Sequence, residues 1–246
     1  MCNIADRDLV AENITHYAGS DTCFPASNHL IMQEIIDATE LFVKQELAGA
    51  EGGHDWWHIY RVWQQSRHIA SKEQVDMLVV ELAALLHDIA DSKFHNGDEQ
   101  VGPAKAEAFL QTQPVPQHII DHVVSIIKHI SFKGGHNNGG FYSPELAVVQ
   151  DADRLDALGA VGIARAFNYG GFKNRALYDP AITPQLNMTK EEYKHSAAPT
   201  INHFYEKLLL LKDRMNTETG KMLAEERHAF MEAYLAQFYK EWNGEV

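Results

Sequence analysis

Three stretches of the sequence combine histidine with carboxylate residues. The first contains His58, the second places His87 directly before Asp88, and the third contains Asp153. Histidine together with carboxylates is a suitable ligand set for a first-row divalent cation. Helical bundles build metal sites from side chains that project from different helices and lie far apart in the sequence. The pattern therefore indicates a candidate metal centre.

The pair His87-Asp88 carries a physical argument of its own, because it directly follows the apolar run Leu82–Leu86. Burying an unpaired carboxylate costs several kcal/mol, and a bound cation removes that cost. The alternative is an ordinary helix end, in which His87 caps a carbonyl and Asp88 faces water. If the sequence contained only this His-Asp pair, without the other two stretches, the helix end would be the favoured interpretation. Asp153 has an alternative as well, which is a salt bridge to Arg154.

Apolar residues recur at helical spacing along almost the whole chain, and the helices they predict must position the three stretches. No alternating run of five or more residues indicates a strand. Asp55 is placed to cap the helix that carries His58. The expected helices are 28–47, 55–67, 74–89, 102–111, 117–130, 144–158 and 161–168, followed by two long helices within 199–242 that break near 216–220.

Two further features concern the second half of the chain. Glycine and proline collect at 134–140, which lacks the Lys-Ser/Thr of a P-loop, and at 170–184. The second stretch is interpreted as a surface loop, a lid or an arm that packs on another copy of the chain. A homodimer is therefore one possible state of the protein. In the last helix, aromatic residues repeat every four positions and indicate a stripe facing the core. These residues are Phe230, Tyr234, Phe238 and Trp242.

Composition limits the partners. The 246 residues include 21 Lys+Arg and 34 Asp+Glu, a formal net charge of −13, which argues against a general binder of nucleic-acid polymers or anionic membranes. The apolar runs are far shorter than the ~20 residues of a membrane span. The start of the chain shows no signal peptide. Cys2 and Cys23 cannot form a disulfide framework. Together these features predict a cytoplasmic protein.

The order and spacing of the three stretches resemble the HD superfamily of metal-dependent phosphohydrolases. The strings GGHDWWHIYRV, LLHDIADSKF, QDADRLDALGAVGIAR and HFYEKLLLLKDRMNTETGKMLAEER are similar to small bacterial HD hydrolases, whose members include nucleotide pyrophosphohydrolases. The similarity extends over about residues 28–242. It implies an all-α fold, the HD-domain helical bundle, with residues 1–27 as an N-terminal arm and 28–246 as a single domain.

The resemblance implies that His58, His87, Asp88 and Asp153 bind one divalent metal. Asp151 is the nearest rival for the last position, and residues two apart on a helix point in different directions, so only one is expected to bind. The resemblance favours Asp153, because family members place this ligand before a basic residue and leucine. The metal stays open among Mn, Mg, Fe, Ni, Co and Zn.

Asp91 follows Asp88 by about one helical turn, and the resemblance implies a general acid or base there; the alternative is a surface carboxylate. A phosphoryl group also needs positive charge for its stabilisation. Arg61 and Lys93 are the favoured candidates, because they lie within the ligand-bearing stretches. Further candidates for substrate binding are Arg154 and Lys133. For each of them the alternative is an ordinary surface charge or a structural salt bridge.

His122 and His129 lie two turns apart on one expected helix and therefore share a face. Such a pair is more often pocket lining or a satisfied part of the core, and His129 is taken as a candidate for substrate binding. A second metal held by the pair is the less favoured alternative. The sequence contains no Gly-rich phosphate loop, and it does not identify the base or sugar of a substrate.

A competing motif is His54-x-x-x-His58, which has the spacing of a zincin helix. The usual glutamate is replaced by Asp55, however, and Gly52-Gly53 place His54 at or before the start of the helix. His54 is therefore expected to line the substrate pocket, or to support a metal ligand by a hydrogen bond, rather than to bind zinc in a protease.

The sequence thus predicts divalent-metal-dependent hydrolysis of a phosphate ester or anhydride in a small anionic molecule, with a nucleotide favoured. The nucleoside triphosphate pyrophosphohydrolase and the nucleotidase are the two forms considered. The metal would act as a Lewis acid and activate water. A phosphodiesterase or alarmone hydrolase with the same ligands is one alternative, and a non-catalytic regulator that binds metal or nucleotide is another.

Overall fold

The computed structural model describes residues 26–49, 55–90, 98–130, 140–186, 188–189, 192 and 196–245. Within these residues the only regular elements are helices, so the predicted all-α fold is confirmed for the described part of the chain. Residues 1–25 of the expected N-terminal arm lie outside it, and the single domain stays a prediction. None of the described helices is long and apolar enough to cross a membrane.

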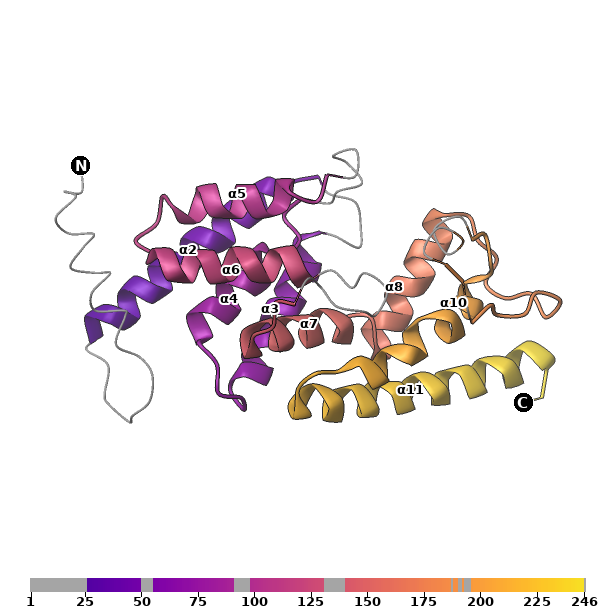
Figure 1. The fold of residues 1–246 in the computed structure, drawn as a ribbon. Coiled ribbons are helices and arrows are strands. Elements are labelled where there is room, and N and C mark those ends of the chain that lie inside the picture. The colour runs from indigo at the N-terminus through magenta and orange to yellow at the C-terminus, as the bar shows by residue number, and fades with distance from the viewer. Residues whose placement is uncertain are drawn as a thin grey trace.

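The first half of the chain forms one side of the molecule (Figure 1). Helix α4 lies at its centre and packs against the helices around it. Eight of the ten residues of α4 are buried, as expected for a helix that is apolar on every face. The elements are α2 (Ala26–Glu46), α3 (Trp56–Ala70), α4 (Met77–Leu86), α5 (Val101–Leu110), α6 (Gln117–Ile130) and α7 (Pro144–Leu155).

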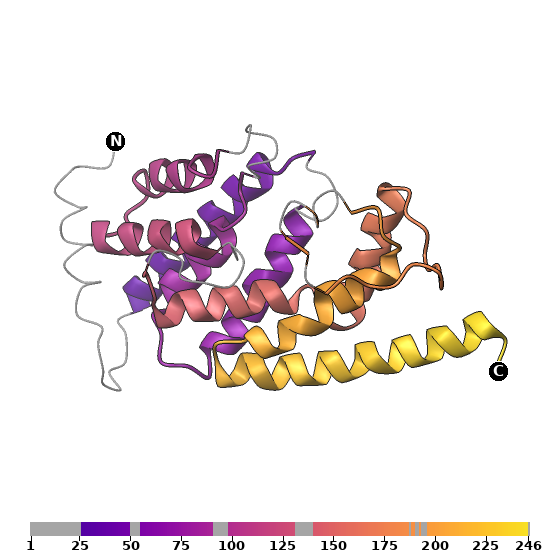
Figure 2. The same cartoon turned by 45° about the vertical axis from the view of Figure 1, so that its right-hand side comes forward.

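The second half lies beside the end of α7, with α11 running along α7 and the shorter helices (Figures 1 and 2). Its elements are α8 (Gly159–Phe172), α10 (Thr200–Glu206), the 3-10 helix η2 (Leu208–Arg214) and α11 (Glu218–Asn243). The turn from α7 into α8 passes through Gly159, whose φ of 69° favours glycine. This turn places Asp156 between the two halves.

The predicted long helix before residue 216 is wrong. Helix α10 ends at Glu206, and Lys207 has φ −143° and ψ −56°, outside the helical region. The chain continues as a 3-10 helix, whose three residues per turn bring Leu208 and Leu211 to the same side. Both leucines are buried. Packing therefore overrides the helical pattern here, while the predicted break near 216–220 is confirmed by Thr217, which caps the start of α11.

The aromatic stripe of α11 is buried only in part. The Tyr234 ring stacks on the fully buried Phe204 at 6.1 Å between centroids. Phe230 and Trp242, however, are 53% and 47% exposed, so the prediction that they face the core is wrong. At 26 residues α11 is about 39 Å long. The seven-residue elements α10 and η2 are too short to cover its whole length.

The described part of the connection after α8 folds back onto the second half. The backbone N–H of Thr200 donates to the carbonyl of Ala176, and that of Ile201 donates to Leu177. The ring of Tyr178 lies 5.3 Å from that of Tyr239 on α11. These contacts favour a packed surface loop over a free arm.

Candidate metal centre

His58 is held in the first turn of α3 by the cap of that helix. The side chain of Asp55 accepts a hydrogen bond from the backbone N–H of His58 at 3.0 Å, as the sequence predicts. The imidazole of His58 is buried, and its Nδ1 lies 2.8 Å from Oδ2 of Asp156. A carboxylate can only accept, so Nδ1 carries the proton. The lone pair is then on Nε2, the atom that a metal binds.

His87 follows the last residue of α4, and its ring is oriented by the same logic. Its Nδ1 lies 2.8 Å from the carbonyl oxygen of Ala84, which can only accept, so Nδ1 is the donor. Its Nε2 is buried and has no hydrogen-bond partner. A buried lone pair without a donor is costly unless something outside the protein occupies it. The unpartnered Nε2 of His87 therefore fits the role of a metal ligand.

The predicted ligand groups gather at one place. One ligand atom from each of His58, His87 and Asp88 lies within 4.8 Å of the other two. Oδ1 of Asp153, at the end of α7, lies 3.5 Å from Nε2 of His58 and 4.0 Å from Nε2 of His87. Donors at 2.0–2.2 Å from one ion are separated by at most about 4.4 Å. Asp153 thus lies close enough to both histidines to share one ion with them.

Asp151 lies on the buried side of the same helix. Its carboxylate accepts hydrogen bonds from the backbone N–H groups of Asn216 and Thr217 and from the Thr217 hydroxyl, at 2.7–3.0 Å. Burial raises the pKa of Asp151, although the hydrogen bonds from Thr217 and Asn216 oppose the rise. A Cβ added at Gly220 would collide with Oδ2 of Asp151. Asp151 therefore joins α7 to the start of α11, which leaves Asp153 as the carboxylate beside the histidines.

Asp156 and Arg165 are site residues that the sequence interpretation missed. Asp156 is almost fully buried and binds Nε and Nη2 of Arg61 at 2.6 and 3.0 Å and Nη1 of Arg165 at 2.5 Å, besides His58. Burial alone would raise the pKa of Asp156, but the hydrogen bonds from His58 and Arg61 and the charge of Arg165 outweigh it and lower the pKa. The carboxylate is thus kept ionised against His58. Only its position three residues after Asp153 could have marked it.

Arg154, expected to bind substrate, makes structural contacts. Its Nη1 donates to the carbonyl of Arg214 at 2.6 Å and lies 3.3 Å from Oδ1 of Asp151. Burial lowers the pKa of Arg154, and the charge of Asp151 opposes this. Helical spacing explains the direction, because Asp151 is one turn before Arg154 and lies on the side away from the histidines. These contacts favour a structural role over substrate binding.

His129 and His122 each lie within hydrogen-bond distance of a serine residue. Nδ1 of His129 lies 2.7 Å from the carbonyl of Ser125, and Nε2 of His122 lies 2.9 Å from the hydroxyl of Ser143. Among the described residues, the one group of three or more potential ligands is His58, His87 and Asp88. The second metal therefore gains no support. The predicted residues His54, Asp91, Lys93 and Lys133 lie outside the described residues.

Comparison with known proteins identifies the family. The HD domain model matches residues 56–158, which contain all four predicted ligands. The chain is 38% identical to protein YpgQ of Bacillus subtilis over 221 residues, which cover 87% of this chain and 97% of YpgQ.

Solved structures agree. A crystal structure of an HD-superfamily hydrolase from Bacillus thuringiensis shares 44% identity with a TM-score of 0.70, covering 86% of this chain and 98% of that one. The crystal structure of Bacillus subtilis YpgQ in complex with ADP shares 36% identity with a TM-score of 0.66, covering 86% and 96%. With this similarity over nearly its whole length, and with the His and His-Asp pattern gathered at one place, the chain belongs to the HD superfamily of hydrolases.

Proposed function

We propose that this protein is a divalent-metal-dependent phosphohydrolase that acts on a nucleotide, as a nucleoside triphosphate pyrophosphohydrolase or a nucleotidase. The observation that carries the proposal is the pair of orientated imidazoles. Nδ1 of His58 and Nδ1 of His87 each donate a hydrogen bond to a fixed acceptor. The lone pair of each ring is therefore on Nε2, and both Nε2 atoms lie near the carboxylate of Asp153. A ligand atom of Asp88 lies within 4.8 Å of a ligand atom of each histidine, which supports it as a further donor.

The donor set suits one hard or borderline cation. Two imidazole nitrogens and two carboxylates are ligands that Mn, Fe, Co, Ni and Zn accept, and Mg accepts carboxylates together with water. When bound, the cation supplies Lewis acidity toward a phosphate oxygen and lowers the pKa of water. Four protein ligands would leave room on the cation for water and a phosphate oxygen. The side chain of Asp153 is 41% exposed, so solvent reaches this part of the cluster.

The protein's own residues then perform three tasks. His58, His87, Asp88 and Asp153 hold the cation. Asp156 holds the ring of His58 in one tautomer and one orientation. Arg61 approaches the site from one helical turn beyond His58 and offers positive charge to a phosphate. Asp91 as general acid or base, with Lys93, Lys133 and His54 beside the substrate, stays part of the proposal.

The nucleotide is proposed from the relatives. The YpgQ crystal structure contains ADP, and this chain covers nearly the whole length of YpgQ. ADP supplies a phosphate chain for the cation and a nucleoside that a neighbouring surface must accept. A small phosphorylated molecule also suits a chain whose net charge of −13 repels polymeric phosphate.

A substrate panel tests the proposal. Purified protein is first analysed for metals, and then incubated with nucleoside mono-, di- and triphosphates, guanosine alarmones and cyclic dinucleotides, with Mn²⁺ or Mg²⁺ added. Released pyrophosphate or orthophosphate from a simple nucleotide is the expected result. If the protein turns over only alarmones or only cyclic dinucleotides, it is an alarmone hydrolase or a phosphodiesterase instead. Tight nucleotide binding without turnover across the whole panel would indicate a regulator.

A further inference from the structure

A groove of about 420 Å³ runs between α3 and α8 beside the candidate metal centre. Arg61 of α3 and Arg165 of α8 line it, and both bind Asp156. Asp156 in turn binds the candidate ligand His58, so the groove and the centre share one hydrogen-bonded cluster. The volume lies within the range of about 300–1,000 Å³ that small-molecule sites occupy.

Two cationic side chains lie at the end of the groove at this cluster. The guanidinium groups of Arg61 and Arg165 both pair with the carboxylate of Asp156. Asp156 fixes Arg61 through Nε and Nη2, and Nη1 of Arg61 has no acceptor among the described residues. A guanidinium held in this way is a prepared donor for an anionic oxygen.

The rest of the groove is a strip of small side chains on α8. Ala160, Val161, Ala164 and Asn168 line it and are all exposed, and their spacing places Ala160, Ala164 and Asn168 on one face of the helix. Small apolar side chains leave room for a flat ring to lie against the helix. Asn168, one turn beyond Ala164, supplies an amide that both donates and accepts. This chemistry suits a nucleobase and its ribose.

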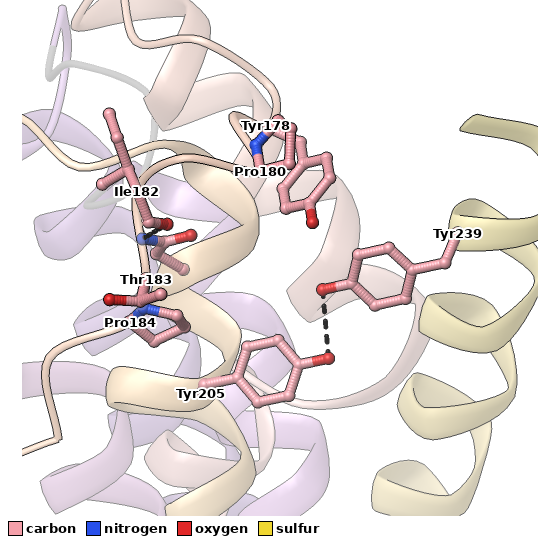
Figure 3. A pocket seen from close by; sticks show the side chains of 8 residues that line it. Tyr178, Pro180, Ile182, Thr183, Pro184, Tyr205 and Tyr239 are labelled. Carbon is pink, nitrogen blue, oxygen red and sulfur yellow. Dashed lines mark hydrogen bonds between the residues drawn. The ribbon is translucent and has the colours of Figure 1, made fainter. Parts of the chain in front are cut away.

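A second hollow, shown in Figure 3, lacks these features. It measures about 280 Å³ and lies between the connection after α8, α10 and α11. Tyr178, Tyr205 and Tyr239 line it, and the hydroxyls of Tyr205 and Tyr239 bond to each other at 3.1 Å. No charged side chain lines this hollow among the described residues. Of these two hollows, the groove beside α3 is the one that combines an apolar floor with cations.

We propose that the groove between α3 and α8 is a nucleoside-phosphate subsite. The base lies against Ala160, Val161 and Ala164, and the amide of Asn168 binds the base edge or the ribose. Nη1 of Arg61 binds a phosphate oxygen on the side of the metal centre. The assignment rests on the proposed function, because it places the nucleoside of the substrate whose phosphates that function assigns to the metal.

The variant Ala164→Leu tests the subsite. Leucine is a good helix former and position 164 is exposed, so the fold tolerates it, while the larger side chain occupies the floor of the groove. Titration calorimetry on the metal-loaded protein compares ADP with inorganic pyrophosphate, which has no nucleoside. ADP is expected to bind Ala164→Leu at least about tenfold more weakly than wild type, and pyrophosphate is expected to bind both proteins equally.

The matched control is Ala233→Leu, the same change at an exposed position of α11 away from the groove, which should bind ADP as wild type does. Equal ADP affinity for Ala164→Leu and wild type would overturn the subsite. An equal loss of affinity for ADP and for pyrophosphate would also overturn it, because the substitution would then act on phosphate binding and not on the nucleoside. If the wild-type protein neither binds nor hydrolyses a nucleotide, the proposed function itself is wrong. This result differs from a failure of the subsite alone, in which the wild type and Ala164→Leu bind ADP equally well.

Discussion

The two sides of helix α7 place acidic side chains in opposite environments. On the inner side, Asp151 is fully buried and its oxygens accept backbone and hydroxyl hydrogen bonds from Asn216 and Thr217. On the other side, Asp153 is partly exposed and lies beside the Nε2 atoms of His58 and His87. A carboxylate enclosed by main-chain donors holds two helices together, whereas one that faces imidazole lone pairs is available to a cation.

The largest expected effect comes from His87→Ala. Loss of the buried Nε2 removes a donor from the cation, so bound metal should be lost and kcat/KM should fall on the order of a thousandfold or more, because Lewis-acid stabilisation is worth several kcal/mol. Metal analysis and nucleotide hydrolysis measure this. The control is His118→Ala, an exposed histidine of α6. Full metal content and activity in His87→Ala would show that His87 is not a metal ligand.

The pair Asp153→Asn and Asp151→Asn separates the two sides of α7. Asp153→Asn should weaken metal binding by more than the roughly 10–100-fold typical of an outer-shell loss and leave the Tm unchanged. Asp151→Asn turns an amide toward backbone donors. Its expected cost of about 2 kcal/mol lowers the Tm by about 4–8 °C at unchanged metal affinity. Titration and scanning calorimetry on both variants check this, and a shared phenotype would contradict it.

Asp156→Asn should have a smaller effect on the same centre. The neutral amide accepts from Nδ1 of His58 more weakly than the carboxylate does, and it weakens the contacts of Arg61 and Arg165. Metal affinity should fall about 10–100-fold, as for other partners of metal-binding histidines. Titration of the metal-free protein with Mn²⁺ measures it. A Co²⁺ absorption spectrum like that of wild type would argue against a positioning role for Asp156.

The smallest expected effect is that of Asp55→Ala, which removes the cap of α3. The loss should be about 1 kcal/mol, and the Tm should fall by about 2–4 °C. Thermal unfolding followed by circular dichroism tests this, with Glu225→Ala at an exposed position of α11 as a surface control. An unchanged Tm would show that packing alone positions His58.

The sequence was informative wherever local rules decide the structure. Periodicity predicted the helices that carry the site, and Asp55 was recognised as a cap. The 3-10 helix after Glu206 was missed because tertiary packing of Leu208 and Leu211 selects it. Asp156 and Arg165 were missed because their contact exists only once α3, α7 and α8 meet. Arg154 was placed beside the substrate by proximity in sequence, although helical geometry turns it toward Asp151.

Four side chains from three separate stretches are proposed to share one divalent cation. Anomalous scattering from crystals soaked with Mn²⁺, collected near the manganese edge, tests this proposal. One strong peak per chain is expected, within bonding distance of Nε2 of His58, Nε2 of His87 and the carboxylates of Asp88 and Asp153. A map without a peak there, or with manganese bound only elsewhere, would rule out the shared cation.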